Sequence, residues 1–131
     1  MKLEAQGLSK KYAGKIVVDN LNIIVKPGEI VGLLGPNGAG KTTFFYMIAG
    51  LVKSNSGKIL IDGQDITEKS ISERANKGLA YLPQEPSVFR RLTVEENLLA
   101  ALEQRKDLNK TERSIELRKL VEEFQLEDFL N

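Results

Sequence analysis

Hydrophobic residues at the start of the chain alternate with polar residues or form short β-branched runs. Leu3, Ala5 and Leu8 mark one strand-like segment, and residues 16–18 form a β-branched run. Residues 21–25 show the period of two that is typical of a strand with one apolar face. We therefore expect several short strands here, antiparallel to one another.

The next apolar segments predict a buried strand followed by a helix. Residues 30–34 (Ile-Val-Gly-Leu-Leu) have the composition of a buried strand. Residues 42–51 then show the i, i+3, i+4, i+7 spacing of an amphipathic helix. The apolar positions of this helix are Phe44, Met47, Ile48 and Leu51.

The remainder of the chain changes from strands to helices. Residues 58–61 and 79–82 each predict a further strand, and residues 70–77 are a weak helix candidate. Two capping boxes then predict the starts of two helices. Their residues are Thr93 with Glu96 and Asn109 with Glu112.

Composition excludes several kinds of chemistry. The chain has 131 residues and a net charge of +1, so no basic field indicates a nucleic-acid partner. It has no cysteine and no histidine, which excludes disulfides, thiolate metal sites and a histidine general base. The sequence shows no membrane-spanning run and no signal peptide, so we expect a soluble, cytoplasmic protein that reaches a membrane only through a partner.

The strongest motif lies between the predicted strand 30–34 and the helix that follows. Residues 35–42 read Gly-Pro-Asn-Gly-Ala-Gly-Lys-Thr, which fits the phosphate-binding loop (P-loop) pattern G-x-x-x-x-G-K-[ST]. Strand, glycine-rich loop and helix are the context that this motif requires. The alternative is a plain glycine turn, which has no need of Lys-Thr at this spacing.

Each residue type in the motif suits a phosphate. Glycines let main-chain N–H groups approach phosphate oxygens without a Cβ in the way, and the positive end of the following helix favours the same anion. We expect Lys41 to be a catalytic cation that reaches the β- and γ-phosphates, and the Thr42 hydroxyl to ligate Mg²⁺. The predicted nucleotide-binding residues of the loop are Gly35, Pro36, Asn37, Gly38, Ala39, Gly40, Lys41, Thr42 and Thr43.

The P-loop and a glutamine directly after a later predicted strand resemble the ATP-binding domain of ABC transporters. Pro27-Gly28-Glu29 and residues 56–63 also match that family, and the resemblance covers the whole chain. It implies an α/β P-loop NTPase fold that is present in part: an antiparallel β subdomain, an incomplete RecA-like core and the start of a helical subdomain. The implied N-terminal part of one ATP-binding domain spans residues 1–131. Its β subdomain and P-loop core are residues 1–92, and the start of its helical subdomain is residues 93–131.

The resemblance implies ATP and Mg²⁺ as cofactors. It also implies roles for three residues outside the P-loop. Tyr12 matches the aromatic residue that stacks on adenine; the alternative is an ordinary aromatic of an edge strand. Val17 would line the same adenine pocket, or it is simply part of the core. Gln84 matches the catalytic Q-loop glutamine, which ligates Mg²⁺ and senses the γ-phosphate; by itself it would be a polar loop residue.

Phe89, Arg90 and Arg91 follow the Q-loop, in the region that faces the membrane subunits in this family. An exposed aromatic residue beside two arginines has the composition of an interface hot spot. The alternative is a phenylalanine that covers the core beside two solvated arginines. The resemblance implies transmembrane transporter subunits as partners, a homodimer of ATP-binding subunits in the complete protein, and a peripheral location on the cytoplasmic face of the inner membrane.

Motifs that complete the catalytic site of this family are absent from the sequence. It contains no Leu-Ser-Gly-Gly signature, no later strand ending in Asp-Glu and no switch histidine. We therefore interpret the chain as an N-terminal half. By itself it should bind nucleotide weakly or not at all and should not hydrolyse it, because the group that orients water and the loop that closes the site are missing.

Two stretches, 42–52 and 81–94, narrow the resemblance. They are similar to the ATPase subunits of bacterial lipopolysaccharide exporters, and branched-chain amino-acid importer ATPases share part of the pattern. The leading hypothesis is a subunit that couples ATP binding and hydrolysis to transmembrane export. A non-catalytic nucleotide-binding half-domain and a soluble P-loop enzyme such as a kinase are the alternatives.

Overall fold

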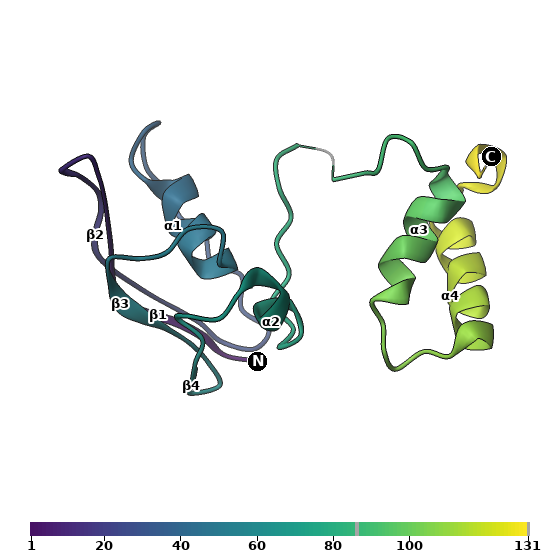
Figure 1. The fold of residues 1–131 in the computed structure, drawn as a ribbon, viewed down its shortest axis with the longest axis horizontal. Coiled ribbons are helices and arrows are strands. Elements are labelled where there is room, and N and C mark those ends of the chain that lie inside the picture. The colour runs from purple at the N-terminus through teal and green to yellow at the C-terminus, as the bar shows by residue number, and fades with distance from the viewer. Residues whose placement is uncertain (86, 131) are drawn as a thin grey trace. The chain divides into compact units, whose positions relative to one another are not determined.

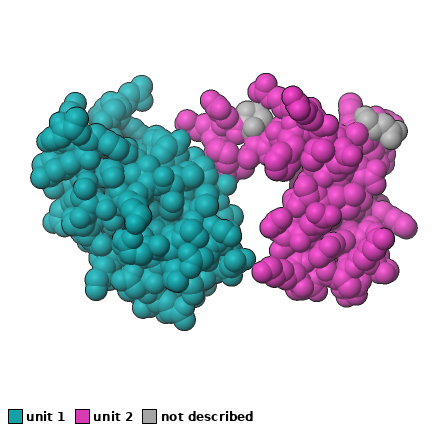
Figure 2. All heavy atoms as spheres, viewed as in Figure 1, with its two compact units in different colours: residues 1–81 teal, residues 82–131 magenta. Residues whose placement is uncertain are grey.

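The structure, a computed structural model, describes residues 1–85 and 87–130. Pro86 and Asn131, which the predicted domain includes, lie outside the described residues. The chain divides into two compact units, the first ending at Tyr81 and the second comprising the rest, coloured teal and magenta in Figure 2. Each unit has a hydrophobic core of its own. The predicted boundary between the subdomains stays a prediction.

The first unit is built on a four-stranded antiparallel sheet with the order β2-β1-β3-β4 (Figure 1). Its strands are β1 (Leu3–Tyr12), β2 (Lys15–Val25), β3 (Ser56–Ile61) and β4 (Gln64–Asp65). The predicted antiparallel strands are confirmed, and the runs 16–18 and 21–25 join into one strand. Asn20 lies between these runs with a φ of 46°, and its N–H donates to the Ser9 hydroxyl at 2.9 Å, so β2 continues through an irregular position.

One helix provides most of the apolar cover of this sheet. The helices of the first unit are α1 (Lys41–Ala49) and α2 (Ile71–Ala75). Phe44, Met47 and Ile48 of α1 are buried in one cluster with residues of the strands. Leu51, the fourth position of the predicted apolar stripe, is half exposed because Gly50 ends the helix with a left-handed φ of 88°.

Arg74 of α2 joins the C-terminal end of α1 to the loop before α2. Its side chain is buried, and its guanidinium donates to the carbonyl oxygens of Met47 and Ile48 at 2.7 and 2.6 Å. It also donates to the carbonyl oxygens of Lys69 and Thr67 at 2.8 and 2.7 Å. Burial lowers the pKa of Arg74 from its ordinary value, but a guanidinium remains charged at neutral pH.

Two predicted strands do not form. The segments 30–34 and 79–82 have extended sequence patterns, but neither is a strand in the structure. Ile30, Leu34 and Leu82 are 99%, 95% and 92% exposed. A strand needs a neighbour for its N–H and C=O groups, and no segment in the described part of the chain pairs with either of these two. The prediction of a buried strand before the P-loop is therefore wrong for this structure.

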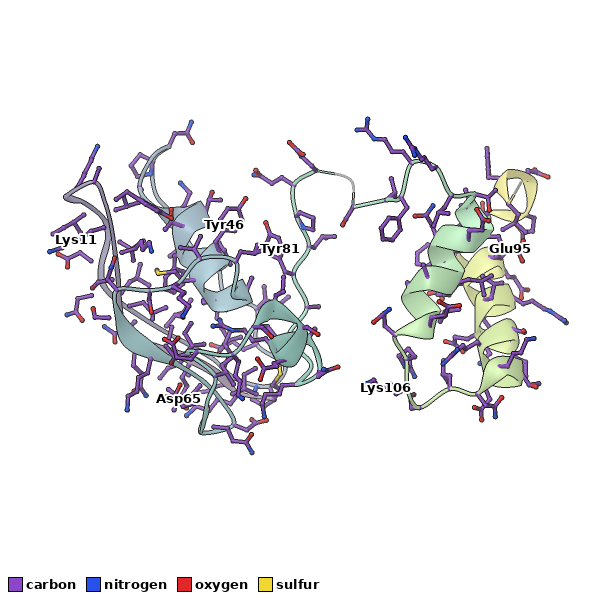
Figure 3. All side chains as sticks on the ribbon, in the orientation of Figure 1. Lys11, Tyr46, Asp65, Tyr81, Glu95 and Lys106 are labelled. Carbon is purple, nitrogen blue, oxygen red and sulfur yellow. The ribbon has the colours of Figure 1, made fainter. Side chains whose placement is uncertain are left out.

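An apolar cavity of about 190 Å³ lies between these two segments, the sheet and α1. Val31 and Leu33 line it, which preserves the period of two expected for the strand, and Leu79 and Tyr81 line it from the other segment. The ring of Tyr81 meets the ring of Tyr46 in α1 edge-on, with 6.0 Å between ring centres (Figure 3). Both segments thus keep apolar side chains toward the core of the first unit.

The second unit is a pair of helices followed by a short 3₁₀ helix. Its elements are α3 (Val94–Glu103), α4 (Lys110–Glu123) and η1 (Glu127–Phe129). Leu102, Leu117 and Val121 form its buried core, and the predicted capping boxes form at Thr93 and Asn109. Among the described helices of the chain, none is long and apolar enough to cross a bilayer.

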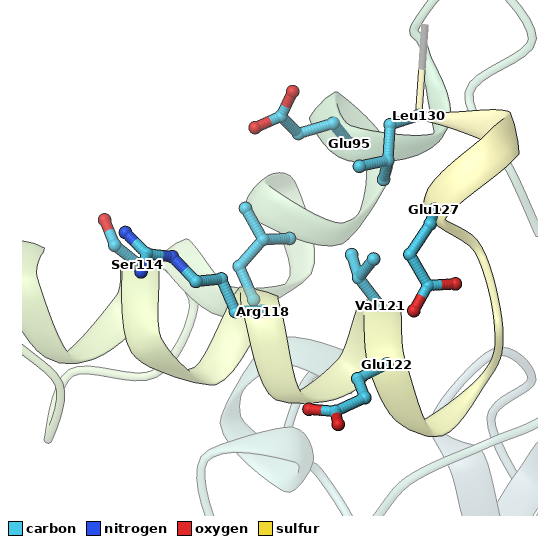
Figure 4. A pocket seen from close by; sticks show the side chains of 8 residues that line it. Glu95, Ser114, Arg118, Val121, Glu122, Glu127 and Leu130 are labelled. Carbon is cyan, nitrogen blue, oxygen red and sulfur yellow. The ribbon is translucent and has the colours of Figure 1, made fainter.

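A hollow of about 530 Å³ opens between α3, α4 and η1 (Figure 4). The residues that line it are Glu95, Ser114, Leu117, Arg118, Val121, Glu122, Glu127 and Leu130. Leu117 and Val121 also belong to the core, so the hollow is an open side of that core with charged residues around it. None of these lining residues belongs to the predicted nucleotide or partner sites.

We predict that Arg74→Met lowers the free energy of unfolding by about 3 kcal/mol, because buried carbonyl oxygens lose their donor. Arg105→Met is a matched control that should leave unfolding almost unchanged, since Arg105 pairs with Asp107 in solvent. Urea unfolding followed by circular dichroism measures both variants. Equal effects of the two substitutions would contradict the structural role of Arg74.

Candidate nucleotide-binding site

The P-loop, residues 35–42, connects the extended segment 30–34 to α1. Gly35 to Ala39 are exposed, and the Ala39 N–H donates to the Pro36 carbonyl at 3.2 Å, which closes a turn. The loop therefore exposes its main chain directly before the first turn of a helix.

Gly40 fixes this loop against the sheet. It is buried and has a left-handed φ of 83°. A Cβ at this position would lie 2.2 Å from the Val17 carbonyl oxygen and 3.2 Å from Cγ2 of Val18. Only glycine meets both constraints, so packing against β2 requires Gly40, the last glycine of the motif, whether or not a ligand binds.

The N-terminal end of α1 differs from those of α2, α3 and α4. Ser70, Thr93 and Asn109 cap those three helices, and a glutamate three residues later completes each capping box. At α1 the N-cap is Gly40, and no side chain of the described residues accepts from the first N–H groups. Because residues 41–43 include no carboxylate, these N–H groups and the positive helix end are available to an anion.

Lys41 is held by the loop that precedes it. Its ammonium donates to the carbonyl oxygen of Gly35 at 2.6 Å and to that of Pro36 at 2.7 Å. An ammonium group has three N–H bonds, so one remains for an acceptor such as a phosphate oxygen. The side chain is thus oriented in advance, which reduces the conformational entropy that binding would cost.

These features fit the phosphates of a nucleotide. Residues 35–43 combine main-chain N–H donors with an ammonium group and contain no carboxylate. Thr42 is exposed at the start of α1, and its hydroxyl oxygen is the hard kind of ligand that Mg²⁺ prefers. Thr43 is partly buried beside it. The individual roles of these residues stay predictions.

Tyr12 and Val17 lie on the hairpin formed by β1 and β2. Tyr12 pairs with Lys15 and is 46% exposed, and the ammonium of Lys10 lies 5.2 Å from the centre of its ring. Val17 is partly buried, and its main chain adjoins Gly40. The structure therefore brings Val17 to the P-loop and leaves the Tyr12 ring accessible. Both roles in adenine binding stay predictions.

The remaining predicted site residues belong to the second unit. Gln84, Phe89, Arg90 and Arg91 are all exposed. Phe89 is 64% exposed, which favours a role at the surface over one in the core of its own unit. Because Gln84 and Thr42 lie in different units, a shared Mg²⁺ site of these two residues stays a prediction.

Two residues with many polar contacts have no motif that marks them. Arg74 holds the C-terminal end of α1, and Asn97 in α3 makes four hydrogen bonds of 2.8–3.2 Å with the main chain of residues 89–93. The hydrogen-bond partners of both side chains are main-chain groups, which every residue has, so the sequence gives no sign of these contacts. The one available signal for Asn97 is its poor helix propensity at a position inside a helix.

Comparison with known proteins gives the family. The family model described as ABC transporter matches residues 18–131. The lipopolysaccharide export system ATP-binding protein LptB of Haemophilus influenzae is 54% identical over 124 residues, which cover 95% of this chain and 52% of that protein. LptB of Escherichia coli K12 is 50% identical over 125 residues, with coverages of 95% and 52%. The chain spans about half the length of the curated relatives it matches.

Solved structures agree with this family. An ATP-binding subunit of an ABC transporter matches with a TM-score of 0.81 at 35% identity, covering 99% of this chain and 53% of that chain. A nucleotide-free ATP-binding cassette from an ABC transporter matches with a TM-score of 0.78 at 28% identity, covering 99% and 56%. The predicted fold class, a partial P-loop NTPase domain of the ABC type, is confirmed. With the family match over residues 18–131, these similarities establish that the chain belongs to the ABC transporter family.

Proposed function

We propose that the chain is the N-terminal half of an ATP-binding subunit that couples ATP binding and hydrolysis to transmembrane export of lipopolysaccharide. The observation that supports ATP binding is the N-terminal end of α1, which has no side-chain cap among the described residues and lies beside the Lys41 ammonium. Loop carbonyls already hold that ammonium in place. The substrate part is supported by the relatives, because LptB proteins at 54% and 50% identity are named as ATP-binding proteins of lipopolysaccharide export.

In this proposal the P-loop holds the phosphates of ATP. Its main-chain N–H groups and the Lys41 ammonium bind the β- and γ-phosphates, and Lys41 offsets their negative charge. The Thr42 hydroxyl and the Gln84 side chain hold Mg²⁺, which neutralises further phosphate charge when bound. Tyr12 stacks on adenine, and Val17 lines the pocket beside it.

The segment 89–91 is the proposed contact with the membrane subunits. Phe89 supplies exposed apolar area, and Arg90 and Arg91 supply positive charge next to it. Such an aromatic and arginine cluster has the composition of interface hot spots. Two complete ATP-binding subunits would form a homodimer around nucleotide, peripheral on the cytoplasmic face of the inner membrane.

We predict that Lys41→Ala weakens ATP binding by the complete subunit about tenfold to a hundredfold, because it removes a charge-assisted hydrogen bond and the countercharge. Isothermal titration calorimetry with Mg-ATP measures the affinity. Lys53→Ala is the control, since Lys53 forms an exposed ion pair with Glu68. Unchanged affinity in the Lys41 variant would count against the proposed site.

We predict that residues 1–131 alone release no phosphate from ATP, whereas the complete subunit does. Hydrolysis needs a group that orients the attacking water and contacts that close the site, and the motifs of this family for both are absent from the sequence. A phosphate-release assay on both proteins at equal concentration makes the comparison. Turnover by the 131-residue chain at the rate of the complete subunit would be incompatible with this assignment.

Phe89→Ala should leave ATP affinity unchanged but weaken binding to the membrane subunits about tenfold or more, as truncation of a hot spot does. Phe124→Ala is a matched control, because Phe124 is 61% exposed in the same unit and Phe89 is 64% exposed. Titration of detergent-solubilised membrane subunits with labelled ATP-binding subunit measures the interaction. The interface proposal fails if the two variants bind alike.

A further inference from the structure

Residues 89–92 form a turn that carries the proposed partner surface. The Leu92 N–H donates to the Phe89 carbonyl at 3.0 Å, so Arg90 and Arg91 occupy the two central positions. Their side chains are exposed, as is that of Phe89. One main-chain hydrogen bond does not offset the entropy lost when four residues are ordered, so the turn needs other contacts to keep one conformation.

The side chain of Asn97 supplies these contacts. Its Oδ1 accepts from the Phe89 N–H at 2.8 Å, and its Nδ2 donates to the Phe89 carbonyl at 3.1 Å. Nδ2 also donates to the Leu92 carbonyl at 3.2 Å and to the Thr93 carbonyl at 2.9 Å. A single amide group therefore binds both the first and the last residue of the turn, with two N–H bonds shared among three acceptors.

Asn97 is itself fixed by the start of α3. The Thr93 Oγ1 accepts from the Glu96 N–H at 3.2 Å, and the Glu96 Oε2 accepts from the Thr93 N–H at 2.8 Å. The main-chain N–H of Asn97 donates to the Thr93 carbonyl at 3.0 Å, as helical geometry requires. The turn is thus tied to a helix end that is closed by its own capping box.

The contacts explain why asparagine occupies a helical position for which its propensity is poor. The turn requires an acceptor for one N–H and a donor for several carbonyls on one short side chain. Aspartate would keep the acceptor but would place a carboxylate against three carbonyl oxygens, and alanine would provide neither group. The turn therefore requires the amide group of Asn97, and a side chain of similar size without both a donor and an acceptor would not replace it.

We propose that Asn97 is a positioning residue for partner recognition. It holds the turn so that Phe89, Arg90 and Arg91 are presented together to a partner segment that combines an apolar pocket with carboxylates. This inference rests on the proposed function of the turn as the contact with the membrane subunits. Ordering the turn in advance strengthens binding, because the entropy of ordering is not lost at the moment of association.

The test uses the complete ATP-binding subunit and its solubilised membrane subunits. Asn97→Ala and Asn97→Asp should each weaken their association about tenfold, the effect of losing one or two net hydrogen bonds. ATP affinity should stay unchanged, and hydrogen exchange of the Phe89 amide should accelerate while that of α4 does not. Asn109→Ala is the matched control, since the Asn109 side chain binds the N–H groups of Thr111 and Glu112 instead.

A double variant separates positioning from a general loss of stability. If Asn97 acts through Phe89, adding Asn97→Ala to Phe89→Ala costs less affinity than Asn97→Ala does alone. Additive losses, an equal loss in Asn109→Ala, or full affinity in both Asn97 variants while Phe89→Ala stays weak would overturn the inference and leave the proposed function in place. Full affinity in Phe89→Ala would instead remove the proposed contact, and the inference with it.

Discussion

The close approach of Gly40 to the main chain of Val17 is the constraint on which the first unit depends. A Cβ at position 40 would lie 2.2 Å from the Val17 carbonyl oxygen, so α1 can begin at this point of the sheet only because residue 40 has no side chain. For the same reason the helix has no side-chain cap among the described residues, and its first N–H groups have no side-chain acceptor there. Packing and the proposed anion binding therefore depend on the same residue.

The two ends of α1 are stabilised in different ways. At the C-terminal end Arg74 donates to the carbonyls of Met47 and Ile48, which places a cation where the helix dipole favours one. At the N-terminal end Lys41 turns back to the loop carbonyls, and the first main-chain N–H groups have no side-chain acceptor among the described residues. The helix is held by its apolar face and its C-terminal end. Its N-terminal end can therefore keep unsatisfied donors without loss of the fold.

Features whose partners lie close in sequence could be predicted. The P-loop and the capping boxes at Thr93 and Asn109 need only residues a few positions away, and the structure contains both boxes. The strands at 30–34 and 79–82 were predicted wrongly, because a strand also needs a neighbouring strand and its own sequence does not specify one. No sequence signal marks Arg74, because all its acceptors are main-chain carbonyls, two in α1 and two in the loop before α2, and a carbonyl has no sequence signature.

The unpaired segment 30–34 and the proposed phosphate site are linked through the main chain. Gly35 follows the segment directly, and its carbonyl is one of two loop oxygens that hold the Lys41 ammonium. Ile30 and Leu34 are almost fully exposed, and burying each would contribute about 1.5–3 kcal/mol. A strand that paired with this segment would satisfy its N–H and C=O groups and fix the position of Gly35, whereas burial of Ile30 and Leu34 would need elements packed on that face of the sheet. Pairing of this segment and the position of the proposed phosphate-binding loop are therefore coupled, because Gly35 follows the segment directly.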